Sequence, residues 1–160
     1  MAEVFIGIGS SLNRSESVKV GIQSLKNMFG TLSISPLYES EAVGFKGENF
    51  YNLVVGFITT LQVKELLSQL KKIEIESGRL ENAIKFTPRT LDLDLLLYDD
   101  YVEPQLNIPR AEITKNAFVL KPLAEIAPDR IHPVLNKTYQ QLWTEYPKKS
   151  QKLWQITDHL

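Results

Sequence analysis

The chain has 160 residues, of which 43% are hydrophobic; it contains no cysteine, and its formal net charge is -1. The near-neutral charge gives no general attraction for nucleic acid or an anionic membrane, and the absence of cysteine excludes disulfides, thiol nucleophiles and thiolate metal sites. This length and hydrophobic fraction predict a single domain over residues 1–160. The first residues do not resemble a signal peptide, and no apolar run approaches the ~20 residues of a membrane span, so we expect a cytoplasmic protein.

The N-terminal part is predicted to form a strand and then a helix. Residues 4–10 are an apolar strand that ends in small residues. Gly7 and Gly9 within it are a weak dinucleotide-binding signal, because the third glycine of that motif is missing. Apolar side chains spaced by four, three and four residues predict a helix that ends at Gly30, and these are Val18, Ile22, Leu25 and Phe29.

Two β-prone segments, a loop and a second helix follow. Residues 31–38 are β-prone but interrupted by a proline, and residues 39–49 are predicted to be a loop that could act as a lid. The longest strand signal of the chain covers residues 50–60. Residues 63–77 have the spacing of an amphipathic helix, which we expect Gly78 to close.

The segment 87–99 places two carboxylates in an apolar strand. Because successive side chains of a strand point to opposite faces, Asp92 and Asp94 are expected to lie side by side. Two neighbouring carboxylates repel each other, which favours a hard cation between them, and Arg89 adds a phosphate-binding group. The alternative is a solvated edge strand whose charges oppose aggregation. The predicted faces carry Asp92, Asp94, Leu96 and Tyr98 on one side and Leu91, Leu93, Leu95 and Leu97 on the other.

The C-terminal part is predicted to contain two short helices. They cover residues 116–126, interrupted at Lys121-Pro122, and residues 139–146. The order strand, helix, strand, strand, helix, strand predicts an α+β fold of the ferredoxin-like split βαβ kind. In this sandwich an antiparallel sheet carries both main helices on one face and leaves the other face for ligand loops.

Five segments resemble a known enzyme family, and they are Ile8-Gly9-Ser10, Phe50-Tyr51-Asn52, Glu74 to Gly78-Arg79, residues 88–94 (Pro-Arg-Thr-Leu-Asp-Leu-Asp) and residues 118–128. Through them nearly the whole chain is similar to the 6-hydroxymethyl-7,8-dihydropterin pyrophosphokinases of folate biosynthesis. The resemblance implies a transferase that moves pyrophosphate from ATP to the hydroxymethyl oxygen of the dihydropterin and releases AMP. Its substrates are then small molecules, with no nucleic acid or membrane partner, and we expect a monomer.

The resemblance also implies site residues and a cofactor. Two Mg²⁺ ions are expected at Asp92 and Asp94, where they would neutralise charge that develops on the phosphates. From the residue alone, Asn52 is interpreted as a satisfied core hydrogen bonder, and the resemblance instead makes it a reader of the pterin edge. The implied catalytic residues are Arg79, Arg89, Asp92 and Asp94; the ATP-side residues are Glu74, Arg79, Arg89, Arg110 and Lys115; the pterin-side residues are Ser40, Val43, Phe50, Asn52, Asp92 and Phe118.

The segment 110–117 departs from the family pattern, which tends to place histidine and further arginines there. We expect Arg110 to be the substitute cation for ATP and Lys115 to be the weaker candidate. Two alternatives remain open. One is a degenerate pterin-binding module of the same fold with weak or no ATP turnover. The other is an RNA-binding sheet, which the acidic balance disfavours.

Overall fold

The structure is a computed structural model of the chain, and it describes residues 1–11, 14–40, 49–81, 91–147 and 152–156. The helices are α1 (Arg14–Phe29), α2 (Val63–Glu81), α3 (Ala117–Ile126) and α4 (Tyr139–Glu145), with two 3-10 turns, η1 (Pro104–Leu106) and η2 (Ala111–Thr114). The strands are β1 (Ala2–Ser10), β2 (Ser33–Ile34), β3 (Leu37–Ser40), β4 (Phe50–Thr59), β5 (Asp92–Tyr98) and β6 (Leu153–Ile156). None of the described helices is long and apolar enough to cross a membrane.

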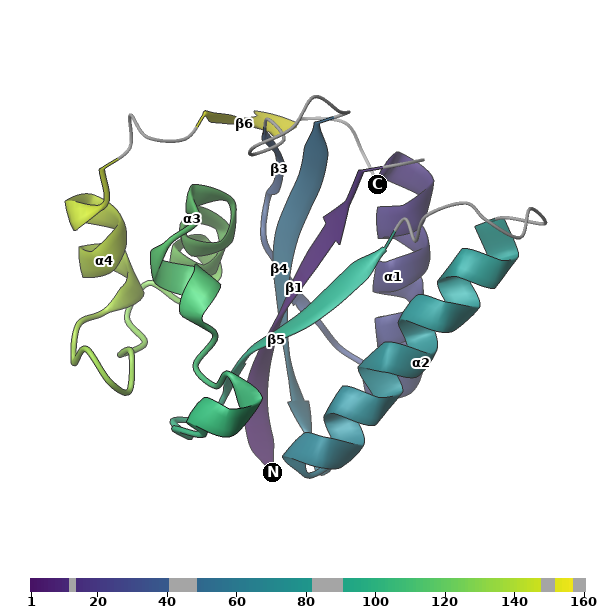
Figure 1. Cartoon of the computed structure of the whole chain (residues 1–160), viewed down its shortest axis with the longest axis horizontal. Coiled ribbons are helices and arrows are strands. Elements are labelled where there is room, and N and C mark those ends of the chain that lie inside the picture. The colour runs from purple at the N-terminus through teal and green to yellow at the C-terminus, as the bar shows by residue number, and fades with distance from the viewer. Residues whose placement is uncertain (12–13, 41–48, 82–90, 148–151, 157–160) are drawn as a thin grey trace.

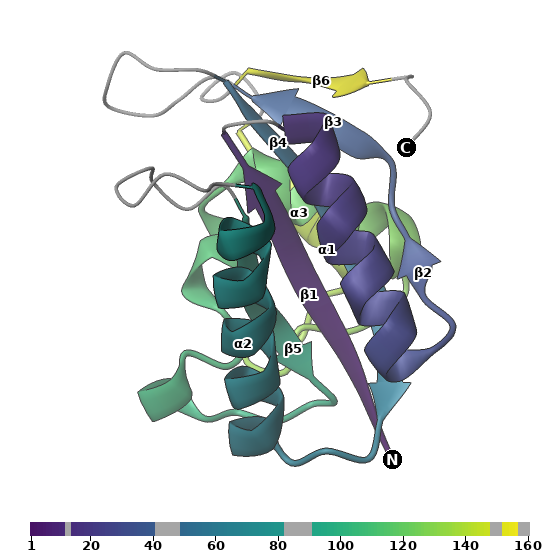
Figure 2. The same ribbon diagram turned by 90° about the vertical axis from the view of Figure 1, so that its right-hand side faces the viewer.

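The elements form three layers with the sheet in the middle. The strand order is β5-β1-β4-β3-β6, β2 also pairs with β4, and the pairings are antiparallel. Helices α1 and α2 cover one face, while α3 and α4 lie on the other (Figure 1). Figure 2 shows α1 and α2 side by side in front of β1. The predicted α+β fold, with both main helices on one face of an antiparallel sheet, is therefore confirmed.

The alternation of β1 explains why the sheet has two different cores. Val4, Ile6 and Ile8 are buried on the face covered by α1 and α2, where the predicted apolar faces of both helices meet them. Phe5 points to the opposite face and joins a second core that α3 and α4 complete. Full burial of a large aliphatic side chain is worth about 1.5–3 kcal/mol, so these two cores fix the sheet between its helices.

The predicted facing of β5 is correct up to Leu96 and wrong for the last two residues. The pairing of β1 with β5 shifts at a bulge, so that Ile6 pairs with Leu95 and Phe5 pairs with Leu97. A bulge adds one residue to a strand and reverses the alternation beyond it. As a result Leu97 lies in the core of α3 and α4, and Tyr98 lies in the core of α1 and α2.

The predicted end of α2 and the predicted interruption of α3 were also wrong. Helix α2 continues through Gly78 to Glu81, because a glycine costs a helix interior about 1 kcal/mol but does not end it when helix formers follow. Helix α3 continues through Pro122 without interruption. Proline costs a helix about 3 kcal/mol, and the buried face of α3 outweighs this cost. The buried residues of α3 are Ala117, Leu120, Pro122, Leu123 and Ala124.

Candidate active site

The register of the sheet brings the pterin-side and carboxylate residues into rows across three strands. Gly9 of β1 pairs with Asn52 of β4 on one side and with Asp92 of β5 on the other. In the next row on the same face, Gly7 lies between Val54 and Asp94. The central strand therefore contributes two glycines, which leave the floor between β4 and β5 without side chains.

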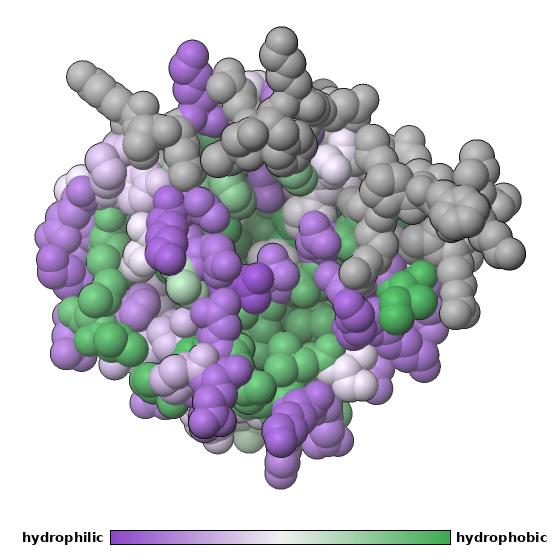
Figure 3. Space-filling view, in the orientation of Figure 1, coloured by the Kyte–Doolittle hydropathy of each residue, from purple (hydrophilic) through white to green (hydrophobic). Residues whose placement is uncertain are grey.

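A cavity of about 190 Å³ lies over these rows. The first turn of α3 and the segment before it close its other side, and its described lining includes Asn52, Asp92, Asp94, Arg110 and Phe118. In the view of Figure 3 the surface is hollowed near the middle of the molecule, between α3 and β5, where hydrophilic and hydrophobic residues meet. The structure thus brings the predicted carboxylates, amide and aromatic ring into one cleft.

The carboxylate of Asp94 is held among three charged groups. The Nη2 atom of Arg110 lies 3.6 Å from Asp94 Oδ1, and its Nε atom lies 3.1 Å from Glu112 Oε2. Burial raises the pKa of Asp94; Arg110 opposes this rise, while Asp92 and Glu112 add to it. Asp92 is exposed at the start of β5. The site therefore already attracts a positively charged group, and the guanidinium of Arg110 neutralises part of its negative charge.

Main-chain contacts explain how Arg110 reaches the strand. Its backbone N–H donates to the carbonyl of Leu96 over 3.0 Å, which anchors the segment after Pro109 against the bulge of β5. The 3-10 turn η2 begins at the next residue, and its first N–H donates to Asn107 Oδ1 over 2.9 Å. Because Leu96 is two residues from Asp94, this anchor places the guanidinium beside the carboxylate pair.

The pterin-side residues come from β3, β4 and α3. Asn52 is buried in β4, and its Nδ2 atom donates to Ser40 Oγ over 3.2 Å. Phe50, at the start of β4, and Phe118, in the first turn of α3, both line the cavity and are half-buried. A cavity lined by an oriented amide and two aromatic rings suits a flat heterocycle that carries hydrogen-bonding groups on its edge.

Glu74 occupies a different position from the cavity residues. Its carboxylate is buried between α2 and β5 and accepts the backbone N–H of Leu93 over 2.7 Å. Leu93 lies between the two aspartates in β5, which is an edge strand. This hydrogen bond therefore satisfies the outer edge of the strand at the point where the carboxylate pair is presented.

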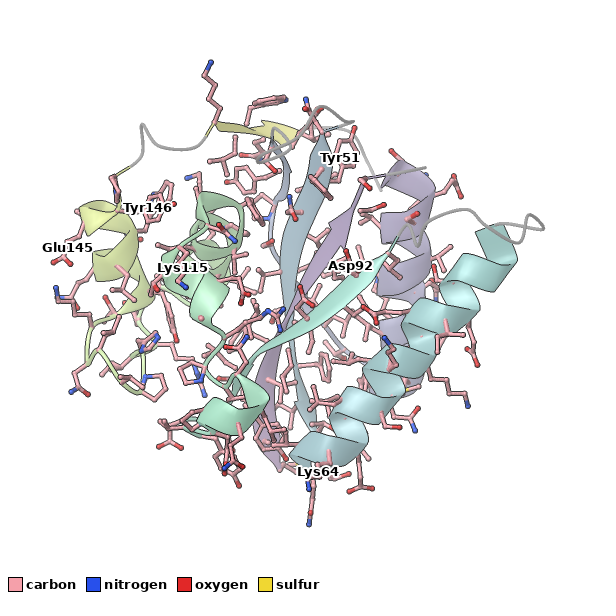
Figure 4. The ribbon with its side chains drawn as sticks, viewed as in Figure 1. Tyr51, Lys64, Asp92, Lys115, Glu145 and Tyr146 are labelled. Carbon is pink, nitrogen blue, oxygen red and sulfur yellow. The ribbon has the colours of Figure 1, made fainter. Side chains whose placement is uncertain are left out.

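Of the remaining predicted residues, Lys115 is described in full and does not line the cleft. Lys115 is exposed, and its carbonyl accepts the hydroxyl of Tyr146 over 2.7 Å. Figure 4 shows Lys115 beside Tyr146 and away from Asp92. Val43 and Arg89 lie outside the described residues, and of Arg79 only the helical backbone is described.

Sequence reasoning missed the role of some residues in the cleft. As a motif Gly7 and Gly9 indicate no more than weak dinucleotide binding, although their spacing of two in a strand already places both on one face. Glu112, which lines the cavity and pairs with Arg110 two residues earlier, had no signal of its own because its position at the cavity depends on the tertiary structure.

The donor set of the cleft is suited to one way of binding a magnesium ion. Among the described residues no group of three or more histidines, cysteines, aspartates or glutamates could hold a metal. Mg²⁺, however, keeps several waters and is usually bound by one or two carboxylates together with substrate phosphates. The adjacent side chains of Asp92 and Asp94, the second of which already pairs with Arg110, fit that mode of binding.

The fold and the cleft define a class of enzyme. Paired carboxylates beside an arginine, over a pocket for a flat ligand, are typical of metal-assisted phosphoryl-group transfer to a small molecule. The sequence model of one family, described as 7,8-dihydro-6-hydroxymethylpterin-pyrophosphokinase (HPPK), matches residues 5–128. The chain belongs to this family and is an ATP-dependent pyrophosphokinase of folate biosynthesis.

Individual relatives support this membership. The chain is 38% identical over 149 residues to the 2-amino-4-hydroxy-6-hydroxymethyldihydropteridine pyrophosphokinase of Aquifex aeolicus, covering 91% of this chain and 92% of the relative. It is also 38% identical over 129 residues to the folate synthesis bifunctional protein of Arabidopsis thaliana, covering 78% of this chain but 27% of that protein. The match thus spans a single-function relative almost completely and only a part of a bifunctional one.

Solved structures support the fold. A Plasmodium falciparum HPPK-DHPS structure superposes with a TM-score of 0.67 at 15% identity, covering 90% of this chain and 44% of that one. A second HPPK-DHPS structure, in complex with substrates, gives a TM-score of 0.72 at 11% identity over 93% of this chain and 43% of that one. At such identities the likeness concerns the fold alone.

Proposed function

We propose that the described cleft is where this chain transfers pyrophosphate from ATP to the hydroxymethyl group of 6-hydroxymethyl-7,8-dihydropterin. The observation that supports the proposal most directly is the row Asn52–Gly9–Asp92, which puts an amide for the heterocycle and a carboxylate for the phosphates on the two strands that flank β1. The single residue between them has no side chain, so the two substrates can approach each other across β1.

In the proposed reaction the hydroxymethyl oxygen attacks the β-phosphorus of ATP. A bond forms between that oxygen and the β-phosphorus, and the bond from the β-phosphorus to the oxygen that bridges it to the α-phosphorus breaks. AMP leaves with the bonding electron pair, and the hydroxyl proton passes to solvent. Asn52 and the rings of Phe50 and Phe118 hold the heterocycle, and this positioning supplies much of the rate enhancement.

We propose that Asp92 and Asp94 hold two Mg²⁺ ions together with the ATP phosphates. When bound, Mg²⁺ supplies charge neutralisation for the phosphate oxygens. The role of the protein is to keep the two carboxylates adjacent, and the hydrogen bond from Leu93 to Glu74 holds the strand segment that carries them. Arg79 and Arg89, whose side chains are not described, remain proposed phosphate ligands on the strength of the family pattern.

Arg110 is the proposed cation for the outer phosphates. Its guanidinium lies beside Asp94 and Glu112 and is 28% exposed, so one face is still accessible from the cavity. A planar guanidinium can hold two phosphate oxygens at once. Lys115 is the weaker candidate because it does not line the cavity.

The test combines two variants with two readouts. Asp92→Ala and Asp94→Ala are each expected to lower kcat for AMP formation by at least about 100-fold, because about 2.7 kcal/mol of transition-state stabilisation would be lost. Titration with the dihydropterin should give nearly unchanged affinity in both variants, since Asn52 and the aromatic rings are intact. Near wild-type kcat in either variant would contradict the paired-metal assignment.

We propose further that the enzyme acts as a monomer in the cytoplasm. Light scattering during gel filtration tests the monomer, and a stable dimer at micromolar concentration would contradict it.

Pterin binding without AMP formation in the wild type would instead support the degenerate binding module.

A further inference from the structure

Gly9 is the residue of β1 that separates the amide from the carboxylates. A methyl group built on its Cα atom would lie 3.1 Å from Asn52 Oδ1, which is closer than ordinary van der Waals contact. Apart from Gly9 itself and its two neighbours in the chain, the only other described atom within 4 Å is the carbonyl oxygen of Tyr51, at 4.0 Å. No described atom of Asp92 lies that close, so the restriction acts on the amide side of the cleft and not on the carboxylate side.

The restriction is spatial and not conformational. Gly9 lies in a regular strand and does not have the positive φ that favours glycine, unlike Gly30, whose φ is 85°. Any L-residue can adopt the backbone conformation of a regular strand. What position 9 requires is therefore the absence of a side chain.

The amide of Asn52 has little freedom to move away. Its Nδ2 atom is bound to Ser40 Oγ on the β3 side, which turns Oδ1 toward Gly9. A side chain at position 9 would push Oδ1 back, and the buried amide would lose either this hydrogen bond or its orientation toward the cavity. Gly7, two residues earlier, is less restricted, because its added methyl would meet the end of Leu96 at 3.4 Å.

We propose that Gly9 is a specificity-determining residue for the pterin: its bare backbone fixes the orientation of the Asn52 acceptor oxygen and forms the floor over which the flat heterocycle lies. This inference rests on the proposed function of Asn52. A side chain at position 9 is expected to weaken pterin binding and to leave ATP binding unchanged, because the added methyl has no described contact on the Asp92 side.

The experiment measures Gly9→Ala against Gly21→Ala. Gly21 lies in α1, and its added methyl would also approach a side chain at 3.1 Å, that of Leu91, but on the face covered by the helices. Gly9→Ala should raise the dissociation constant and the KM of the dihydropterin about tenfold, equivalent to ~1.4 kcal/mol, with the KM of ATP within about twofold. Gly21→Ala should leave both KM values within about twofold of the wild type.

A double-mutant cycle keeps the test decisive if Gly9→Ala folds poorly. In an Asn52→Ala background the contact partner is absent, so Gly9→Ala should fold and should weaken pterin binding no further. Unchanged pterin affinity in Gly9→Ala would overturn the inference, as would an equal loss for both substrates or full additivity in the cycle. Because pterin titration needs no turnover, a wild type that binds pterin but forms no AMP would refute the proposed function and still allow this test.

Discussion

Replacing Asp94 with asparagine should separate the catalytic role of this residue from its contribution to the fold. In the protein without metal, Asp94 is 46% exposed and lies 3.6 Å from a guanidinium that is 28% exposed. An ion pair exposed to this degree stabilises a protein by at most ~1 kcal/mol. Against it stand the burial of the carboxylate and the repulsion from Asp92 and Glu112, which raise its pKa.

The opposing contributions nearly cancel, so Asp94→Asn should change the free energy of unfolding by ~1 kcal/mol or less. For a chain of this size ~1 kcal/mol shifts Tm by about 2–4 °C. In Mg²⁺-free buffer the variant is therefore expected to melt within about 4 °C of the wild type. In the activity assay, which contains Mg²⁺, its rate of AMP formation should be lower by at least about 100-fold. Thermal unfolding with chelator and a coupled AMP assay measure the two effects.

Asp100→Asn is the matched control, since this exposed carboxylate lies in the turn after β5 and away from the cavity. It should leave both Tm and kcat unchanged. If Asp94→Asn melts more than about 4 °C lower than the wild type in chelator, the carboxylate holds the fold together, and the reasoning from its surroundings is refuted.

Three further predictions concern other parts of the structure. Arg110→Ala should weaken binding of a non-hydrolysable ATP analogue by roughly 1.5–3 kcal/mol with little effect on the pterin; calorimetric titration with unchanged ATP affinity would make this residue a surface arginine. Tyr38→Phe removes the donor that its hydroxyl provides to Glu125 of α3, so urea unfolding should show a loss of about 1–2 kcal/mol, and no loss would show that the contact contributes nothing. Burial lowers the pKa of His132 below its ordinary 6.5, so the free energy of unfolding should fall as the pH drops below about 6.5. The variant His132→Asn keeps an acceptor for the N–H groups of residues 134 and 135 and should reduce that fall. Equal pH dependence of stability in both proteins would contradict the assignment.

The carboxylate pair could be predicted from the sequence because strand alternation is a local property. Asp92 and Asp94 are two residues apart, and any regular strand places them on one face. The facing of Leu97 and Tyr98 could not be predicted in the same way, because the bulge arises from pairing with β1, which is ninety residues distant in the chain. The continuous course of α3 through Pro122 likewise depends on packing against the sheet, which local propensity does not include.

The site shows the same division. The resemblance to the family gave the residue types of the cleft, and the structure confirms that Asn52, Phe118 and the aspartates meet there. The ion pair of Arg110 with Asp94 and the close approach of Gly9 to Asn52 could not be predicted, because each depends on the distance between segments that are separate in the sequence. Helix α2 places Glu74 behind β5, so its contact with the strand also required the tertiary structure.

The most direct test of the central claim is the identity of the products. Wild-type protein would be incubated with ATP, Mg²⁺ and 6-hydroxymethyl-7,8-dihydropterin, and the phosphorus NMR spectrum would be followed over time. The account predicts AMP and the pterin diphosphate in equal amounts, with no ADP formed. Formation of ADP and a pterin monophosphate, or no reaction of ATP while the pterin binds, would contradict it.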